Sequence, residues 1–136
     1  MNKSLSRILA VVGTALLVSV VVASVASAGY KKGQYEGTTS QGHAVSFKAK
    51  KLGVKKFDFT VDLDCADGSV EGFLLTGAQA PTDDKGKFTA TFVGQGTSVV
   101  KGKLKRKKAE GTIESDGVND AGSPCSSSVD WSAKKV

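Results

Sequence analysis

The sequence is poor in proline, histidine, tryptophan and cysteine, and after residue 28 no stretch has helical periodicity. The 136-residue chain contains two prolines, two cysteines, one histidine and one tryptophan. Without apolar residues at a helical repeat, amphipathic helices are not expected beyond residue 28. The single histidine is too few for a zinc site built from nitrogen ligands. A serine nucleophile is also disfavoured, because no Gly-x-Ser-x-Gly motif is present.

Arginine is scarce as well. Beyond residue 28 the only arginine is Arg106, and every other basic residue is a lysine. Arginine forms two-pronged hydrogen bonds with phosphates, whereas lysine is typical of solvated surfaces. Nucleic acid is therefore not an expected partner. No motif in the chain indicates a cofactor.

The N-terminal segment has the composition of a secretory signal peptide. Lys3 and Arg7 precede an apolar run over residues 8–25, and residues 26–28 read Ala-Ser-Ala, a small-x-small cleavage site. The alternative is an uncleaved anchor, since the run is just long enough to span a bilayer. We predict cleavage after residue 28 and a single secreted domain over residues 29–136. No cysteine lies directly after the cleavage site, as a lipid anchor would require, and no second apolar run ends the chain, so no stable membrane anchor is expected after cleavage.

The two cysteines are expected to pair. Exported chains meet an oxidising environment, in which Cys65 and Cys125 would form a disulfide rather than remain free thiols. Loss of Lys3 and Arg7 with the signal would lower the formal net charge from +6 to +4. The mature chain would remain basic.

Short runs with alternating apolar and polar residues recur along the mature chain, which is typical of half-buried β-strands. They predict about eight strands joined by short turns, and therefore mostly antiparallel neighbours. The predicted fold is an all-β sandwich, with a flattened or closed barrel as the alternative. The runs cover residues 34–39, 44–50, 57–65, 70–76, 87–93, 97–105, 109–114 and 125–134.

These runs also predict local features. A simple hairpin register would place Phe47 opposite Phe59 and Lys48 opposite Asp58. Val54 breaks the alternation, which indicates a β-bulge near Lys55. Residues 70–76 are apolar enough for a strand buried on both sides, and residues 77–85 are expected to form a loop.

The mature chain resembles a family of small exported bacterial β-domains of the actinobacterial type, which has no assigned activity. The resemblance implies a secreted all-β domain and carries over no functional residue. It covers nearly the whole mature chain and is carried by turn glycines and core positions, such as Gly33-x-Tyr35-x-Gly37, Gly86-Lys87-Phe88, Gly102-x-Leu104, Ala109-x-Gly111-Thr112 and Trp131-Ser132-Ala133.

An acidic run and the single histidine are the polar features that could indicate a chemical site. Asp62, Asp64 and Asp67 form an acidic run that suggests calcium, but their spacing does not match an EF-hand loop. The simpler interpretation is the solvated face of a strand that ends in a turn. His43 follows Gly42 and is expected to be an exposed turn residue.

All six phenylalanines and Trp131 fall on predicted inward positions, which leaves only Tyr30 and Tyr35 as candidates for a sugar-binding platform. A non-enzymatic binding or structural role is therefore favoured over a small exported hydrolase or a carbohydrate-binding module. No pair of carboxylates is singled out for glycoside hydrolysis.

The strongest local bias is a run of basic residues on one predicted hairpin. It suggests attraction to an anionic polymer of the cell wall, such as teichoic acid. The alternative is a solvated hairpin whose lysines prevent a sheet edge from pairing with other chains. The oligomeric state is left open. The residues of this basic hairpin are Lys101, Lys103, Lys105, Arg106, Lys107 and Lys108.

Overall fold

The structure is a computed structural model that describes residues 29–94 and 96–136. The predicted signal peptide lies outside these residues. The described chain folds into eight antiparallel β-strands and contains no helix. No helix that is long and apolar enough to cross a membrane is therefore present among these residues. The strands are β1 (Gly33–Thr39), β2 (Ala44–Lys50), β3 (Gly53–Cys65), β4 (Val70–Pro81), β5 (Lys87–Val93), β6 (Gly96–Lys105), β7 (Lys108–Val118) and β8 (Pro124–Lys135).

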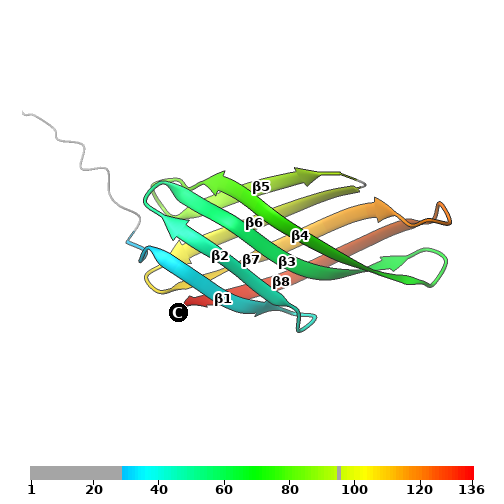
Figure 1. Ribbon diagram of the computed structural model, residues 1–136, viewed down its shortest axis with the longest axis horizontal. Coiled ribbons are helices and arrows are strands. Elements are labelled where there is room, and N and C mark those ends of the chain that lie inside the picture. The colour runs from blue at the N-terminus through cyan, green and yellow to red at the C-terminus, as the bar shows by residue number, and fades with distance from the viewer. Residues whose placement is uncertain (1–28, 95) are drawn as a thin grey trace, which may run out of the picture.

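All eight strands belong to one continuous sheet in the order β4-β3-β2-β1-β8-β7-β6-β5. The first four strands form one layer and the last four form a second layer behind it (Figure 1). Pairing of β1 with β8 joins the two layers along one side. On the other side, β4 and β5 are the two edges of the sheet.

The sheet also closes on itself at one end. β3 and β8 extend past the tip of the β1–β2 hairpin and pair directly there, through Asp64 with Ser126 and Cys65 with Cys125. This pairing completes a ring of β1, β2, β3 and β8. The predicted all-β antiparallel fold is thus confirmed in the form of the barrel alternative. The predicted Cys65–Cys125 disulfide is also confirmed, and it lies within the pairing that closes the ring.

Aromatic rings from both layers fill the space between them. Phe47 stacks on Tyr35 and on Phe57, with ring centroids 5.0 Å and 5.2 Å apart. Trp131 of the second layer meets Phe47 edge-on at 5.8 Å. Tyr35 is completely buried, so it belongs to the core and not to a surface platform. These contacts explain why alternation in the sequence identifies the core positions so well.

The register of β2 against β3 differs from the simple hairpin. Ser46 faces Asp58 and Lys48 faces Lys55, so Phe47 opposes two residues of β3. This irregularity is the predicted bulge, and Lys56 within it has a left-handed φ of 51°. The predicted pairs of Phe47 with Phe59 and Lys48 with Asp58 were wrong, because the turn is tighter than expected: Lys50 already faces Gly53, and the bulge shifts the register by only one residue.

Two strands are also longer or more exposed than predicted. β4 continues to Pro81, through most of the stretch expected to be a loop, and β7 continues to Val118. β4 is not buried on both sides, because it is an edge strand and its Leu74 side chain is 67% exposed. Apolar composition alone did not distinguish an edge strand from a central one.

Candidate functional site: a basic groove at one end of the sheet

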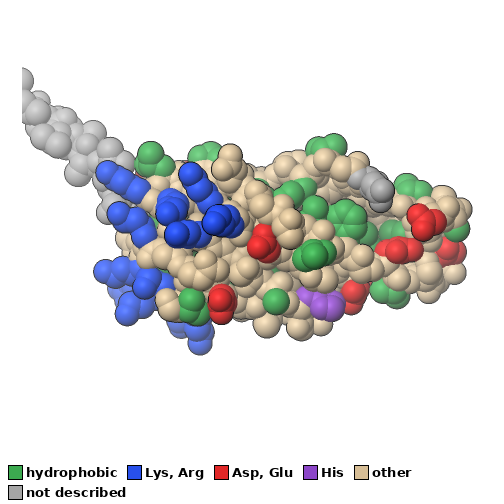
Figure 2. All heavy atoms as spheres, in the orientation of Figure 1, with side chains coloured by type: hydrophobic (Ala, Val, Ile, Leu, Met, Phe, Trp, Pro, Cys, Tyr) green, Lys and Arg blue, Asp and Glu red, His purple; other side chains and the backbone are tan. Residues whose placement is uncertain are grey.

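Charge is separated along the long axis of the molecule. Figure 2 shows Lys and Arg side chains gathered at one end, and most of the Asp and Glu side chains toward the other. The topology explains this, because in an up-and-down sheet every second turn lies at the same end. The basic residues flank the β2–β3, β4–β5 and β6–β7 turns, the start of β1 and the end of β8. We call this region the basic end and the opposite region the acidic end.

The basic end contains an open groove of about 1170 Å³ on the outer face of β1, β8, β7 and β6. Five of the six residues predicted for the basic hairpin line it, and Lys101 does not. The structure adds Lys31 and Lys134 to the set, from strands distant in sequence. The charged lining residues are Lys31, Glu36, Lys103, Lys105, Arg106, Lys107, Lys108, Glu110 and Lys134.

Strand register arranges some of these cations in a row. Lys105 of β6 faces Lys108 of β7, which faces Lys134 of β8. Neighbouring strands lie ~4.8 Å apart, so the three lysines form a cationic row across the sheet about 10 Å long. Glu36 of β1 faces Lys134 and is next in the row. The long side chains form the wall of the groove.

The tip of the β6–β7 hairpin is held in place by its own backbone. Arg106 has a left-handed φ of 59°, a conformation that is unfavourable for any residue with a Cβ atom. Its carbonyl accepts a hydrogen bond from the backbone N–H of Lys31 at 2.7 Å and one from the Tyr35 hydroxyl at 3.1 Å. Burial raises the pKa of that hydroxyl. The tip is thereby attached to the start of β1.

The cations of this end are not neutralised by ion pairs. Within residues 29–94 and 96–136, no Lys or Arg side chain lies within ion-pair distance of a carboxylate. The one contact there between a basic and an acidic side chain is that of His43 with Asp62. Glu36 and Glu110 share the groove but form no such pair there. The groove therefore presents positive charge to the solvent.

A second basic set, absent from the sequence prediction, lies on the β2–β3 hairpin. It comprises Lys48, Lys50, Lys51, Lys55 and Lys56. Through its side-chain contact and its charge, Lys48 lowers the pKa of Lys50, and the charges of Lys55 and Lys56 add to the effect. The signal that could have revealed this set was the recurrence of lysines at every second turn.

The groove continues into a shallower hollow of about 540 Å³ over β1, β7 and β8. The two share Thr38, Glu110 and Ser132. The hollow adds the hydroxyl-bearing residues Ser40 and Thr112 and the carboxylate of Asp130. A chain molecule could thus lie along the outer face, with cations at one end of its path and hydroxyl groups further along.

The candidate metal residues do not converge. In the described part of the chain, no group of three or more His, Cys, Asp or Glu side chains is close enough to hold a metal ion. Asp62 contacts His43, while Asp67 accepts hydrogen bonds from the Ser69 hydroxyl and from Asn119. These hydrogen bonds lower the pKa of Asp67, and those from Ser69 have a larger effect than that from Asn119. These contacts fasten the β3–β4 turn to the β7–β8 turn.

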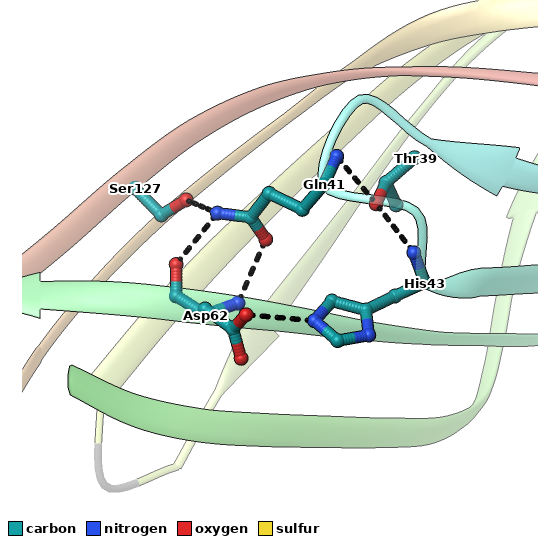
Figure 3. A network of polar contacts seen from close by, with 5 residues as sticks. All are labelled: Thr39, Gln41, His43, Asp62 and Ser127. Carbon is teal, nitrogen blue, oxygen red and sulfur yellow. Dashed lines mark hydrogen bonds and ion pairs between the residues drawn. The ribbon is translucent and has the colours of Figure 1, made fainter.

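His43 lies in the β1–β2 turn, as predicted, but it is half-buried in a polar network (Figure 3). Its Nε2 atom is 2.8 Å from Oδ2 of Asp62. Ser127, the nearby hydroxyl in this network, contacts the Gln41 amide at 3.4 Å instead of the imidazole. The arrangement is therefore not a serine–histidine–aspartate triad.

The Gln41 side chain has a role that the sequence did not indicate. Its amide accepts the Asp62 N–H at 2.8 Å and donates to the Asp62 carbonyl at 2.9 Å (Figure 3). The β2 strand does not reach Asp62, so the amide takes the place of a peptide group of a neighbouring strand. Gln41 thereby bridges β3 and β8 at the point where they begin to converge.

Three alternative interpretations lose support from the geometry. The hairpin lysines do not protect a sheet edge, because β6 and β7 are each paired on both sides. Glu36 and Glu110 are both exposed, whereas a glycosidase acid requires a carboxyl shielded from water. The described aromatic side chains are buried or partly buried, which leaves no stacking platform for sugars.

Comparison with known proteins adds no further identification. No protein-family model matches the chain, and neither the curated proteins nor the solved structures provide a match.

Proposed function

We propose that the chain is an exported, non-enzymatic β-domain that binds anionic polymers of a bacterial cell wall through the groove at its basic end. The observation that carries the proposal is that the lysines and Arg106 of the described chain form no ion pair with a carboxylate. Their charge is therefore available to a ligand. The buried disulfide is compatible with an extracellular location, and the resemblance to exported bacterial domains supports the cell-wall setting.

The chemistry of the groove favours a polymer with repeated negative charges and hydroxyl groups, such as a polyol phosphate. The row of Lys105, Lys108 and Lys134 supplies point charges, and the adjoining hollow supplies hydroxyls. Lysine charges in 0.15 M salt act over only ~8 Å, so binding is weak, salt-sensitive and not specific for a sequence of units. This class of ligand explains both the groove and the excess of lysine over arginine.

The test is retention of the purified domain on isolated cell walls across a salt series. A variant with Lys103, Lys105, Lys108 and Lys134 changed to Gln should elute at clearly lower salt than wild type. The matched control changes Lys48, Lys50, Lys51 and Lys55 to Gln, which removes the same charge outside the groove. The control should elute between the two. A wild-type domain that passes unretained through the walls at low salt would contradict the proposal.

A second pair of variants changes the charge in the opposite direction. Glu36→Gln with Glu110→Gln removes two negative charges from the groove, so retention should extend to higher salt. Asp116→Asn with Asp120→Asn makes the same change in net charge at the acidic end and should have a smaller effect. Equal effects of the two pairs would mean that net charge, and not the groove, controls retention.

A further inference from the structure

The edge strand β4 lacks lysines and internal prolines, two of the features that usually prevent sheet edges from associating, and over residues 70–76 it also has no bulge. It spans Val70–Pro81 and is hydrogen-bonded only to β3, so its other side is unpaired. Exposed edges are normally protected by lysines, by prolines within the strand, by β-bulges or by short length. The only one of these in β4 is a bulge at Thr76 and Gly77. β4 has 12 residues, contains no Lys or Arg, and has its one proline as the last residue. Its single charge is Glu71.

The same strand exposes apolar side chains. Leu74 is 67% exposed on the outer face and Val70 is 60% exposed. Phe73 and Leu75 point toward the core but are only partly buried. An unpaired edge with apolar groups on both faces is the kind of surface that adds a further strand. The other edge, β5, is shorter, contains Lys87 and has exposed threonines at Thr89 and Thr91.

We propose that β4 pairs with β4 of a second copy of this chain, antiparallel and about a twofold axis at Leu74. The sequence around Leu74 is self-complementary, as an isologous contact requires. Phe73 of each copy would face Leu75 of the other, and Leu74 would face its own counterpart. Gly72 would face Thr76, and the pairing would end there, because β4 has a bulge at this point and Gly77 has a left-handed φ of 83°.

Charge favours this orientation. β4 runs from the acidic end, beside Asp64, to the basic end, where Gly53 of the β2–β3 hairpin faces Pro81. An antiparallel pair therefore places the acidic end of each copy beside the basic end of the other. The paired segment, residues 72–76, contains no charged residue, so no like charges would face each other within it. A parallel pair would instead place like charges side by side, which is repulsive.

The experiment is sedimentation equilibrium of the disulfide-bonded chain 29–136, which contains every described strand and the whole described core. Wild type should be in monomer–dimer equilibrium. Leu74→Lys would place two like charges opposite each other and should raise the dimer dissociation constant about tenfold or more. Thr91→Lys adds the same charge to the other edge and should leave the constant unchanged. A wild-type chain that stays monomeric at the highest soluble concentration overturns the proposal, as does a dimer that Leu74→Lys does not weaken.

Cross-linking tests the register and remains informative if Leu74→Lys fails to fold. Leu74→Cys should give a disulfide-linked dimer under mild oxidation, because the two introduced thiols face each other across the axis. Thr91→Cys should cross-link only at the slow rate of random collisions. Equal rates for the two variants would overturn the pairing.

Discussion

The two ends of the molecule are built in opposite ways. The acidic end is fastened by the Cys65–Cys125 disulfide, by the Gln41 amide and by the contacts of Asp67 with the β7–β8 turn. At the basic end, many lysines meet with no ion-pair partner among the described residues, and Arg106 holds a left-handed conformation. Repulsion and backbone strain are thus concentrated at the end that contains the groove.

This difference indicates a division between stability and binding. Covalent and hydrogen-bonded closure at one end can offset the unfavourable crowding of charge at the other. If that interpretation is right, changes at the acidic end should alter the free energy of unfolding and leave wall retention intact. Changes at the basic end should weaken wall retention, and where they relieve strain or repulsion they should also raise stability.

The largest expected effect comes from removal of the disulfide. The bond joins residues 60 positions apart, and a loop of that length is worth roughly 4 kcal/mol in the chain-entropy model. Cys65→Ser with Cys125→Ser should therefore lower the melting temperature by on the order of 20 °C, as measured by circular dichroism. Below that temperature the salt at which the variant elutes from cell walls should not change. An unchanged melting temperature would contradict the proposed division between an end that stabilises the fold and an end that binds.

The Gln41 amide should make a smaller contribution. Gln41→Ala leaves the Asp62 N–H and carbonyl without their partner, and we expect a loss of about 1 kcal/mol because the site is open to water. Urea unfolding measures the loss, and faster hydrogen exchange at the Asp62 amide locates it. Gln41→Glu is the matched control, since a carboxylate keeps the shape but cannot donate to the Asp62 carbonyl. A control as stable as wild type would show that the donated bond does not matter.

Arg106→Gly should affect the two properties in opposite directions. Glycine adopts the left-handed conformation without a Cβ clash, so the domain should gain about 0.5–1 kcal/mol after the extra entropy of glycine is subtracted. Loss of the charge should weaken wall retention. Lys107→Gly removes a charge from the same turn without a positive φ to relieve, so it should weaken retention and lower stability. Equal melting temperatures for the two variants would show that the left-handed conformation of Arg106 does not reduce the stability of the domain.

The smallest expected effect concerns acid. The hydrogen bonds from Ser69, followed by that from Asn119, hold the pKa of Asp67 below its ordinary value. The ionised form is thus favoured in the folded state, and its stabilising effect is complete above the unfolded pKa of about 3.9 and lost as the pH falls through the lower folded value. Asp67→Asn should therefore melt slightly below wild type at pH 7, and the difference should vanish in strong acid. A difference that grows on acidification would contradict this assignment.

Much of the fold could be predicted from sequence because its signals are local. Alternation placed Phe57, Val61 and Trp131 in the core, since a strand directs successive side chains to opposite faces. The break in that alternation at Val54 located the bulge. The cysteine count and the expected compartment predicted the disulfide correctly.

Other features depended on which strands meet. The exposed position of Leu74 follows from β4 being an edge, and the amide role of Gln41 follows from the shorter reach of the β1–β2 hairpin. Neither is encoded in the pattern of the segment itself. The same holds for Lys134, which joins Lys105 and Lys108 only because β8 lies beside β7.

The sequence by itself therefore determined the strands, the core positions, the disulfide partners and the positive charge of one hairpin, because each depends on spacing within a segment or on composition. The tertiary structure decided the closure of β3 on β8, the edge position of β4 and the gathering of lysines from separate turns into one end. These depend on contacts between segments far apart in the chain, whose partners no local pattern specifies.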